Sequence, residues 1–157
     1  MAMKDLFSVK GKVIILTGGK GFLGSQFKRH LTLCGAKVVI LDIQAKTPVD
    51  ITNPEDVKKA VDETLKAHKR IDGMVNVAAI NAVPGSETSN DFWTPYEKYP
   101  LELWKKELEV NLTAAHIVTQ AVAPVMMKQK SGAIVFLASD LAVIAPNNSI
   151  YQEGNFK

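Results

Sequence analysis

The sequence predicts an α/β fold, a doubly wound parallel sheet with helices on both faces. Short runs of mostly β-branched residues, too short for helices, alternate along the chain with longer segments whose apolar residues recur at helical spacing. The first of these strands runs into a glycine-rich turn that opens a helix, which is typical of parallel α/β sheets. Alternation of this kind requires right-handed crossovers between the strands.

The first predicted strand, residues 13–17, ends in a turn with glycines at positions 18, 19, 21 and 24. Apolar residues at helical spacing place a helix over residues 22–34, beginning inside this turn. Glycines without Cβ atoms let the backbone approach a pyrophosphate, and the free N–H groups of a helix N-terminus favour its charge. A tight turn that binds no ligand is the alternative interpretation of the glycines alone.

The second predicted strand, residues 37–42, ends in Asp42, which lies 18 positions beyond Gly24. This offset is close to the roughly 20 residues expected for the acid that bonds the ribose of a dinucleotide. The sequence therefore predicts a dinucleotide site, because one short unit contains a strand, a glycine turn, a helix, a second strand and an acid in this order. A carboxylate at Asp42 would repel a 2′-phosphate and favours NAD, whereas Lys20 in the glycine turn would suit NADP, which stays as the alternative cofactor.

The remaining elements continue the alternation. We expect two further helices and two further strands, over residues 54–68, 101–129, 73–79 and 133–137. Thr52 or Asn53 would cap the first of these helices, with Pro54 at its first position, and Pro124 is expected to kink or break the second. Numbered along the chain, the doubly wound order predicts the strand order 3-2-1-4, with a ligand at the carboxyl ends.

Composition limits the partners that we expect. The 157 residues are 46% hydrophobic and 22% charged with a net charge of +3, which is ordinary for one globular domain. The cations form no basic tract, so no nucleic acid is expected, and no apolar run approaches the roughly 20 residues that span a membrane. Cys34 is expected in the core, and the 3 histidines lack metal-ligand spacing, so no metal site is predicted. A cytoplasmic setting is the default expectation.

Five motifs occur in an order that resembles the short-chain dehydrogenase/reductase family over almost the whole chain. They are the glycine turn, Asp50, the Asn76–Ala79 strand end, Asn111 in the long helix and Ser139 after the last strand. The resemblance implies a Rossmann-like fold that binds a nicotinamide cofactor through Thr17, Gly18, Lys20, Gly21, Phe22, Leu23, Gly24, Asp42, Asp50, Ile51, Asn76, Ala78 and Ala79.

The same resemblance implies catalytic roles for Ser139, Asn111 and Tyr151. Ser139 would hydrogen-bond a substrate carbonyl, or would only cap a helix. Asn111 would hold, through its backbone, a water that relays protons, or would be a tolerated polar residue in a helix. The family's tyrosine has a lysine four residues later, but here Asn155 holds that position and Lys157 follows it. We therefore expect the working Tyr-xxx-Lys pair beyond residue 157, and residues 1–157 to form an NAD(P)-binding domain without its later strands.

The expected function is hydride transfer between nicotinamide and a small alcohol or carbonyl substrate, in a homo-oligomer formed through helix 101–129. Phe22 stands where the family's common branch has glycine, and the glycine spacing is similar to that of its nucleotide-sugar branch. An epimerase or dehydratase acting on a sugar-linked substrate is therefore a second hypothesis. A non-catalytic nucleotide-binding protein is a third, because the chain lacks the Tyr-xxx-Lys pair.

Overall fold

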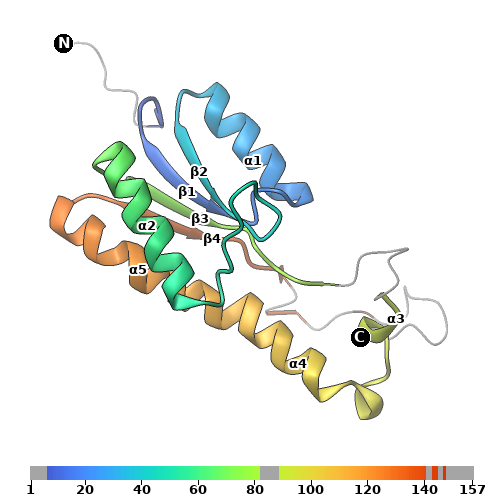
Figure 1. Ribbon diagram of the computed structural model, residues 1–157. Helices are drawn as coiled ribbons and strands as arrows, with labels where there is room; N and C mark the ends of the chain where they lie inside the picture. Colours follow the sequence, from blue (N-terminus) through green and yellow to red (C-terminus); the bar gives the residue numbers. More distant parts are fainter. Residues whose placement is uncertain (1–6, 82–88, 141–142, 145–146, 148–157) are drawn as a thin grey trace.

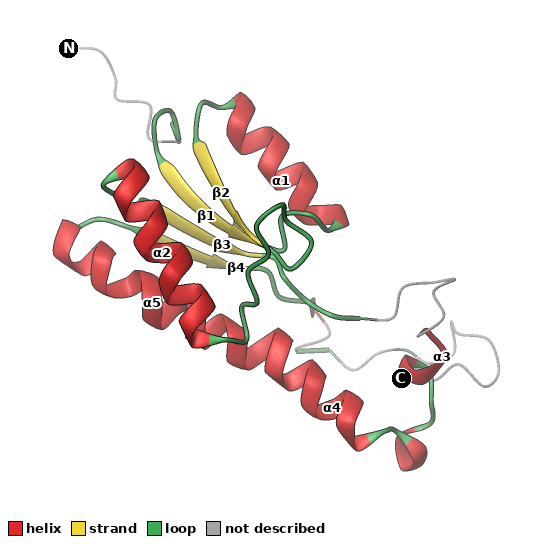
Figure 2. Ribbon diagram, in the orientation of Figure 1, coloured by secondary structure: helices red, strands yellow, loops and turns green. Residues whose placement is uncertain are grey.

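Four parallel strands form one sheet with helices on both faces (Figure 1 and Figure 2). The computed structural model describes residues 7–81, 89–140, 143–144 and 147. The strands are β1 (Val13–Thr17), β2 (Lys37–Leu41), β3 (Gly73–Asn76) and β4 (Ala133–Phe136). One face carries α1 (Phe22–Leu33), and the other carries two neighbouring helices, α2 (Pro54–His68) and α5 (Ala114–Gln129). The predicted α/β fold with a parallel sheet is confirmed.

The strand order is β2-β1-β3-β4, so the predicted order 3-2-1-4 is wrong. The third strand along the chain pairs with β1, from Ile14 against Gly73 to Thr17 against Asn76. It does so because the segment between β2 and α2 forms a loop instead of an edge strand beside β2. In the doubly wound order 3-2-1-4-5, strand 3 is the edge strand beside strand 2. Without it the remaining strands are numbered 2-1-3-4 along the chain, which is the order observed here.

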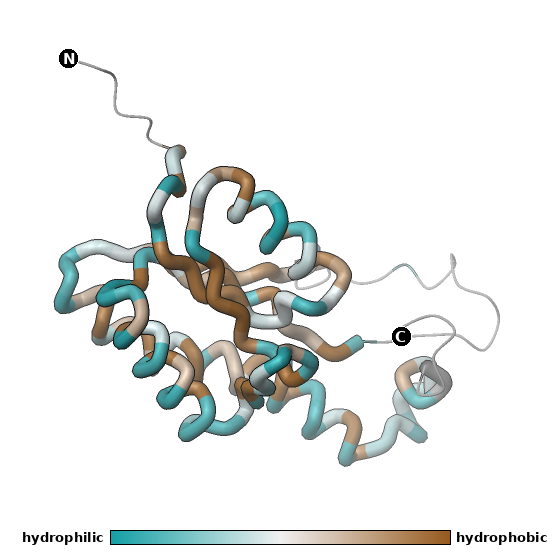
Figure 3. Tube along the Cα trace, turned by 45° about the horizontal axis from the view of Figure 1, so that its top comes forward, coloured by the Kyte–Doolittle hydropathy of each residue, from teal (hydrophilic) through white to brown (hydrophobic). Residues whose placement is uncertain are grey.

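The hydrophobic core lies between the sheet and the pair of helices α2 and α5. Val57 and Val61 of α2 belong to one buried cluster with Val118 and Val122 of α5 and Ile15 of β1. Each buried side chain of this kind contributes about 1.5–3 kcal/mol to folding. Figure 3 shows the hydrophobic strands at the centre of the molecule, with hydrophilic residues on the helices around them. The core between the sheet and the helices α2 and α5 holds the strands in place and leaves their carboxyl ends accessible to a ligand.

The predicted bounds of α2 are confirmed, because local signals set both of its ends. The Asn53 Oδ1 accepts a hydrogen bond from the Glu55 N–H at 2.9 Å, and Pro54 lies in the first turn. Lys69 ends the helix in the left-handed conformation with a φ of 64°, and Lys130 ends α5 in the same way with a φ of 54°. Glycine is the usual residue at such positions.

The predicted helix 101–129 is continuous but changes its winding. It consists of α4 (Leu101–Leu108), a π-helical turn η2 (Glu109–Thr113) and α5. The prediction for Pro124 was a kink or a break, and the break is wrong, because Pro124 lies inside the continuous helix α5. Proline removes the hydrogen bond to the carbonyl of Gln120, but both residues are exposed, and water can satisfy that oxygen.

This long helix is more apolar than the sequence prediction allowed. By length and composition alone, Leu101–Gln129 could cross a membrane, and less than a quarter of its most apolar stretch is buried. The buried residues of α5 recur at a spacing of four, at Ala114, Val118, Val122 and Met126. This stripe packs into the core beside α2 and the sheet, as expected for an amphipathic helix that lies on a sheet.

Two side-chain amides fasten the long helix to the segment that contains β3. Asn111 in η2 accepts a hydrogen bond from the Ile80 N–H at 2.8 Å and donates one to the Ile80 carbonyl at 3.0 Å. Gln129 accepts a hydrogen bond from the Ile71 N–H at 3.0 Å and donates one to the Ile71 carbonyl at 2.7 Å. Because Ile71 precedes β3 and Ile80 follows it, the two amide pairs hold both ends of this segment.

The short helices α3 (Ser89–Phe92) and η1 (Tyr96–Lys98) lie between β3 and α4. The Tyr99 hydroxyl donates a hydrogen bond to the Glu107 carboxylate at 2.6 Å, which ties this segment to α4. Burial of the phenol and its hydrogen bond to the Glu107 carboxylate both raise the pKa of Tyr99.

Cys34 is exposed, so the prediction that it packs in the core is wrong. It caps the C-terminal end of α1, next to Leu33, which is also exposed. Gly24 is the buried residue of α1, because the backbone of Gly18 and Gly19 in the glycine turn packs against it.

Candidate functional site

A cleft of about 890 Å³ opens at the carboxyl ends of the strands, where the doubly wound fold predicts a ligand. Its walls come from the glycine turn after β1, the loop after β2, the segment after β3 and the junction of α4 with η2. The predicted cofactor residues that line it are Gly18, Gly21, Phe22, Leu23, Gly24, Asp42, Asp50, Ile51, Ala78 and Ala79. The fold thus brings residues from separate segments around one space.

The glycines of the turn do not all serve the same purpose. Gly18 has a φ of +64°, and a Cβ there would lie 2.7 Å from the backbone of Ala78. A Cβ on Gly24 would lie 2.0 Å from the Gly18 carbonyl oxygen, so both residues are needed for close packing. A Cβ on Gly21 would meet that same oxygen at 3.4 Å and no other atom within 4 Å among the described residues. The space beside Gly21 therefore belongs to the cleft.

The N-terminus of α1 lines the cleft and has no side-chain cap. Gly21 is the N-cap residue, no side chain among the described residues caps the helix, and the first turn contains no acid. Helix α2 is different, since Asn53 caps it and its first turn contains Glu55 and Asp56. The free N–H groups and the positive end of the α1 dipole are therefore available to an anion in the cleft.

Asp42 at the end of β2 is buried, and both of its carboxylate oxygens accept hydrogen bonds from the backbone. The Oδ2 accepts from the Lys20 N–H and the Oδ1 from the Gln44 N–H, each at 2.8 Å. The first of these bonds ties the glycine turn to the end of β2. Each carboxylate oxygen retains a further lone pair, so ribose hydroxyls can still bond there.

Three predicted cofactor residues do not line the cleft. Thr17 and Asn76 are buried, and the Thr17 hydroxyl donates a hydrogen bond to the Asn76 Oδ1 at 2.6 Å. The same hydroxyl oxygen accepts hydrogen bonds from the Val77 and Ala78 N–H groups at 3.2 Å. These contacts fix the segment after β3 against β1, behind the wall of the cleft. Lys20 is exposed and contributes its backbone to the glycine turn.

Two of the predicted catalytic residues, Ser139 and Asn111, lie outside the cleft lining. Ser139 follows β4, is exposed, and donates a hydrogen bond from its Oγ to the Asp140 Oδ1 at 3.1 Å. Asn111 uses its side chain to hold Ile80, which does line the cleft, so it positions part of the wall. Tyr151 lies outside the described residues.

Further lining residues come from places that the sequence did not single out. They are Leu41, Ile43, Gln44, Val49, Thr52, Val77, Ile80, Asn81, Lys106, Glu109 and Val110. The lining residues next to Asp42, Asp50 and Ala78 could have been predicted from the sequence, because they belong to the same strand ends and loops as those three residues. Lys106, Glu109 and Val110 reach the cleft through the packing of the long helix, for which the sequence contains no local signal.

The parallel sheet, the glycine turn that opens α1 and the buried acid after β2 define an α/β protein with a dinucleotide-type cleft. The sequence model of the family described as short chain dehydrogenase matches residues 12–152. The chain therefore belongs to the short-chain dehydrogenase family of oxidoreductases, as its motifs indicated.

Dehydrogenases are among the known proteins of similar sequence and structure. A mitochondrial borneol dehydrogenase of Lavandula x intermedia is 31% identical over 88% of this chain and 56% of its own length. An NAD-dependent glycerol dehydrogenase of Listeria innocua is 29% identical over 88% of this chain and 57% of its own length. The NAD⁺-bound structure of a xylitol dehydrogenase matches with a TM-score of 0.78 at 25% identity, over 94% of this chain and 60% of that one. This chain thus spans little more than half the length of its relatives.

Proposed function

We propose that the whole protein is an NAD(P)-dependent oxidoreductase that transfers hydride between nicotinamide and a small alcohol or carbonyl compound. The observation that carries this proposal is the uncapped N-terminus of α1, which lines the cleft together with the buried Asp42. A helix N-terminus of this kind suits a pyrophosphate, and the carboxylate suits ribose hydroxyls. The relatives support the same class, since one is named NAD-dependent and another was solved with NAD⁺.

The cofactor would supply the hydride, and the chain would bind and orient it. Gly21 leaves room for a diphosphate, which the first N–H groups of α1 would bond. Asp50 and Ile51, on the loop after β2, would contact the adenine end. The small residues Ala78 and Ala79 would leave space along the end of β3 for the other half of the cofactor.

We expect NAD to bind more tightly than NADP. Two backbone hydrogen bonds fix the Asp42 carboxylate, so a 2′-phosphate would lie against a negative charge that cannot turn away. Lys20 is the neighbouring cation that would favour the phosphate instead, because its side chain is exposed beside this contact.

Titration of both cofactors by calorimetry tests this preference. The Kd for NAD should be lower than that for NADP by about tenfold or more, given the strength of one close like-charge contact. Asp42→Ser should narrow the difference, and Lys20→Gln should leave it unchanged. Tighter binding of NADP that weakens on Lys20→Gln would reverse the assignment.

We assign Ser139 the role of a hydrogen-bond donor to the substrate oxygen. A substrate carbonyl would replace the Asp140 carboxylate that now accepts this bond. Proton exchange needs a further acid–base group, which we place in a Tyr-xxx-Lys pair after residue 157. The greater length of the relatives supports this extension. In the whole protein, Ser139→Ala should lower kcat by about 10²–10³-fold and leave the Kd for NAD unchanged.

The substrate class we propose is a polyol or sugar. Relatives and similar structures are named for glycerol, xylitol and aldohexose. The glycine spacing keeps a nucleotide-linked sugar as the second candidate. An assay panel of polyols, aldoses and nucleotide-linked sugars separates the two, because turnover restricted to the linked sugars would favour the second.

We also propose that the protein forms homo-oligomers through the outer face of α4 and η2. Leu101, Trp104, Leu108 and Leu112 recur there at a spacing of three or four, with exposures between 41% and 66%. A contiguous apolar stripe of this kind is typical of a protein–protein contact. Sedimentation of the Leu108→Glu variant should show a smaller species than the unaltered protein.

A further inference from the structure

The fold gathers cations that are scattered along the sequence onto one edge of the sheet. Four segments meet at the amino ends of the strands, at the opposite end from the cleft (Figure 1): residues 8–12, 34–37, 69–72 and 128–132. Backbone hydrogen bonds join these segments one to the next. The Gly11 N–H donates to the Gly35 carbonyl, the Asp72 N–H to the Val13 carbonyl, and the Ala133 N–H to the Asp72 carbonyl. We name this surface the amino edge. Its cations are Lys10, Lys12, Lys37, Lys69, Arg70, Lys128 and Lys130.

Almost no negative charge offsets these cations. Asp72 is the one acid within the four segments, and its side chain is 5% exposed and already paired with Arg70 and Lys12. In the described part of the chain, no ion pair involves the remaining cations of the edge, which are Lys10, Lys37, Lys69, Lys128 and Lys130. The amino edge therefore presents a concentrated positive potential.

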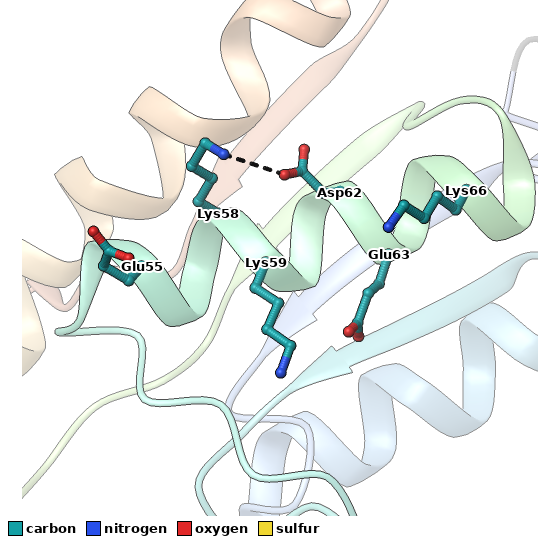
Figure 4. A pocket seen from close by; sticks show the side chains of 6 residues that line it. All are labelled: Glu55, Lys58, Lys59, Asp62, Glu63 and Lys66. Atoms are coloured by element: carbon teal, nitrogen blue, oxygen red, sulfur yellow. Dashed lines mark hydrogen bonds and ion pairs between the residues drawn. The ribbon is translucent and has the colours of Figure 1, made fainter.

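The outer face of α2 shows that this concentration is not a general property of the surface. Acids and cations alternate there, and the Lys58 ammonium lies 3.4 Å from the Asp62 carboxylate (Figure 4). The charged residues of this face are Glu55, Lys58, Lys59, Asp62, Glu63 and Lys66. Charges of both signs nearly cancel on this face, so it supplies a matched control for the amino edge.

Two lysines of the amino edge occupy backbone positions where glycine is favoured. Lys69 and Lys130 have φ values of 64° and 54°, whereas Gly35 fills the comparable position after α1. The negative end of a helix dipole attracts a cation to the last turn of the helix. Lys66 in α2 and Lys128 in α5 already provide that cation, so the dipole does not require a second one at the C-cap. Neither helix therefore needs a lysine at this position in order to end, because glycine adopts the same conformation without strain.

Large apolar side chains stand beside the cations. Phe7, Leu33 and Met127 directly precede three of the four segments, and they are 92%, 72% and 77% exposed. Cations mixed with exposed apolar residues suit a lipid interface, where headgroups attract the charges and the apolar groups enter the acyl boundary. The exposed apolar side chains favour lipid over nucleic acid, because a nucleic-acid backbone offers charge but no acyl boundary for them to enter.

We propose that the amino edge docks the protein onto an anionic membrane surface, with the cleft at the far end of the molecule. No helix needs to enter the bilayer, because the contact is made by headgroup attraction and three shallow side chains. The sequence did not predict this contact, since the cations form no tract and only the parallel sheet assembles them.

Co-sedimentation of the full chain with phosphatidylcholine vesicles, with and without phosphatidylserine, tests this proposal. Binding should require phosphatidylserine and should weaken as salt is added. The double variant Lys69→Gly/Lys130→Gly should bind about 25-fold more weakly, at about fivefold for each charge removed. Its Tm should stay equal or rise, because glycine adopts both capping conformations without strain.

The control variant Lys58→Gln/Lys59→Gln removes the same charge from the outer face of α2 and should bind vesicles like the unaltered protein. Met127→Gln keeps every charge and should still weaken binding. The proposal is overturned if both double variants lose binding equally, or if vesicles without phosphatidylserine bind as well. It is also overturned if the protein binds duplex DNA at concentrations at which it leaves phosphatidylserine vesicles unbound.

Discussion

At the scale of the residue, glycines that look equivalent in the motif have different tasks. Gly18 and Gly24 allow the turn, α1 and the end of β3 to approach one another, because a Cβ on either would overlap backbone atoms. Gly21 leaves space in the cleft instead. The motif therefore combines two folding requirements with one position reserved for a ligand.

A substitution pair separates these tasks. Gly21→Ala should fold normally and lose at least tenfold in affinity for NAD, because its methyl group would fill the space that a diphosphate needs beside α1. Gly24→Ala should lower the free energy of unfolding by about 1–3 kcal/mol or more, as overpacking does. Calorimetric titration and urea denaturation measure the two effects. Unchanged NAD affinity in Gly21→Ala would show that this turn does not hold the diphosphate.

At the scale of the element, one carboxylate secures the starts of β1 and β3. Asp72 accepts a hydrogen bond from the Val13 N–H at 2.9 Å and from the Arg70 Nε at 2.8 Å, and its Oδ1 lies 3.5 Å from the Lys12 ammonium. Burial by itself would raise the pKa of Asp72. The hydrogen bonds from Arg70 and Val13, with the charges of Arg70 and Lys12, outweigh burial and lower that pKa.

This lowered pKa predicts a pH dependence of stability. Since the folded-state pKa of Asp72 lies below its unfolded value of about 3.9, the carboxylate contributes its full stabilisation above about pH 5 and loses it as the pH falls toward the folded pKa. Asp72→Asn should therefore lower the free energy of unfolding by about 1–3 kcal/mol at neutral pH and by less in acid. Urea denaturation at about pH 7 and pH 3 checks this. An equal loss at both values would contradict it.

At the scale of the whole molecule, the sheet ends in an apolar strand. Among the described residues β4 pairs with β3 alone, and Val135 and Phe136 are 50% and 49% exposed. An edge strand with unpaired backbone groups and apolar side chains favours association with another chain. Residues 1–157 produced alone should therefore self-associate in sedimentation experiments, and Val135→Lys should shift them toward monomer. A stable monomer at high concentration would contradict this.

The same 157 residues should show no dehydrogenase turnover on a panel of alcohols and carbonyl compounds. Ser139 and Asn111 can orient and polarise a substrate, but neither exchanges a proton with it. Tyr151 has no lysine four residues later, and the ordinary pKa of tyrosine, about 10, is far from the working pH of an acid–base group. Turnover by a pure preparation that disappears on Tyr151→Phe would make Tyr151 the catalytic residue after all.

What the sequence could predict depends on whether the signal is local. Helix α2 matches its predicted bounds, because Asn53 and Pro54 mark its start within the sequence itself. The strand order was wrong because it depends on whether the loop after β2 forms an edge strand, which no local pattern reveals. The glycine turn and Asp42 were found since both follow strands, whereas Lys106 and Glu109 reach the cleft through a helix more than 20 positions beyond β3.

The two amide pairs on the long helix constrain how the length of this protein can change. Asn111 and Gln129 are 18 residues apart, about 27 Å along a helix, and Ile71 and Ile80 are 9 residues apart, about 30 Å along an extended chain. Deleting one residue of α5 would turn Asn111 by about 100° relative to Gln129, so one amide pair would be lost. The π-helical turn at Asn111 holds an extra residue within the helix, which is how such a segment absorbs an insertion. Natural insertions and deletions should therefore be absent between residues 114 and 129.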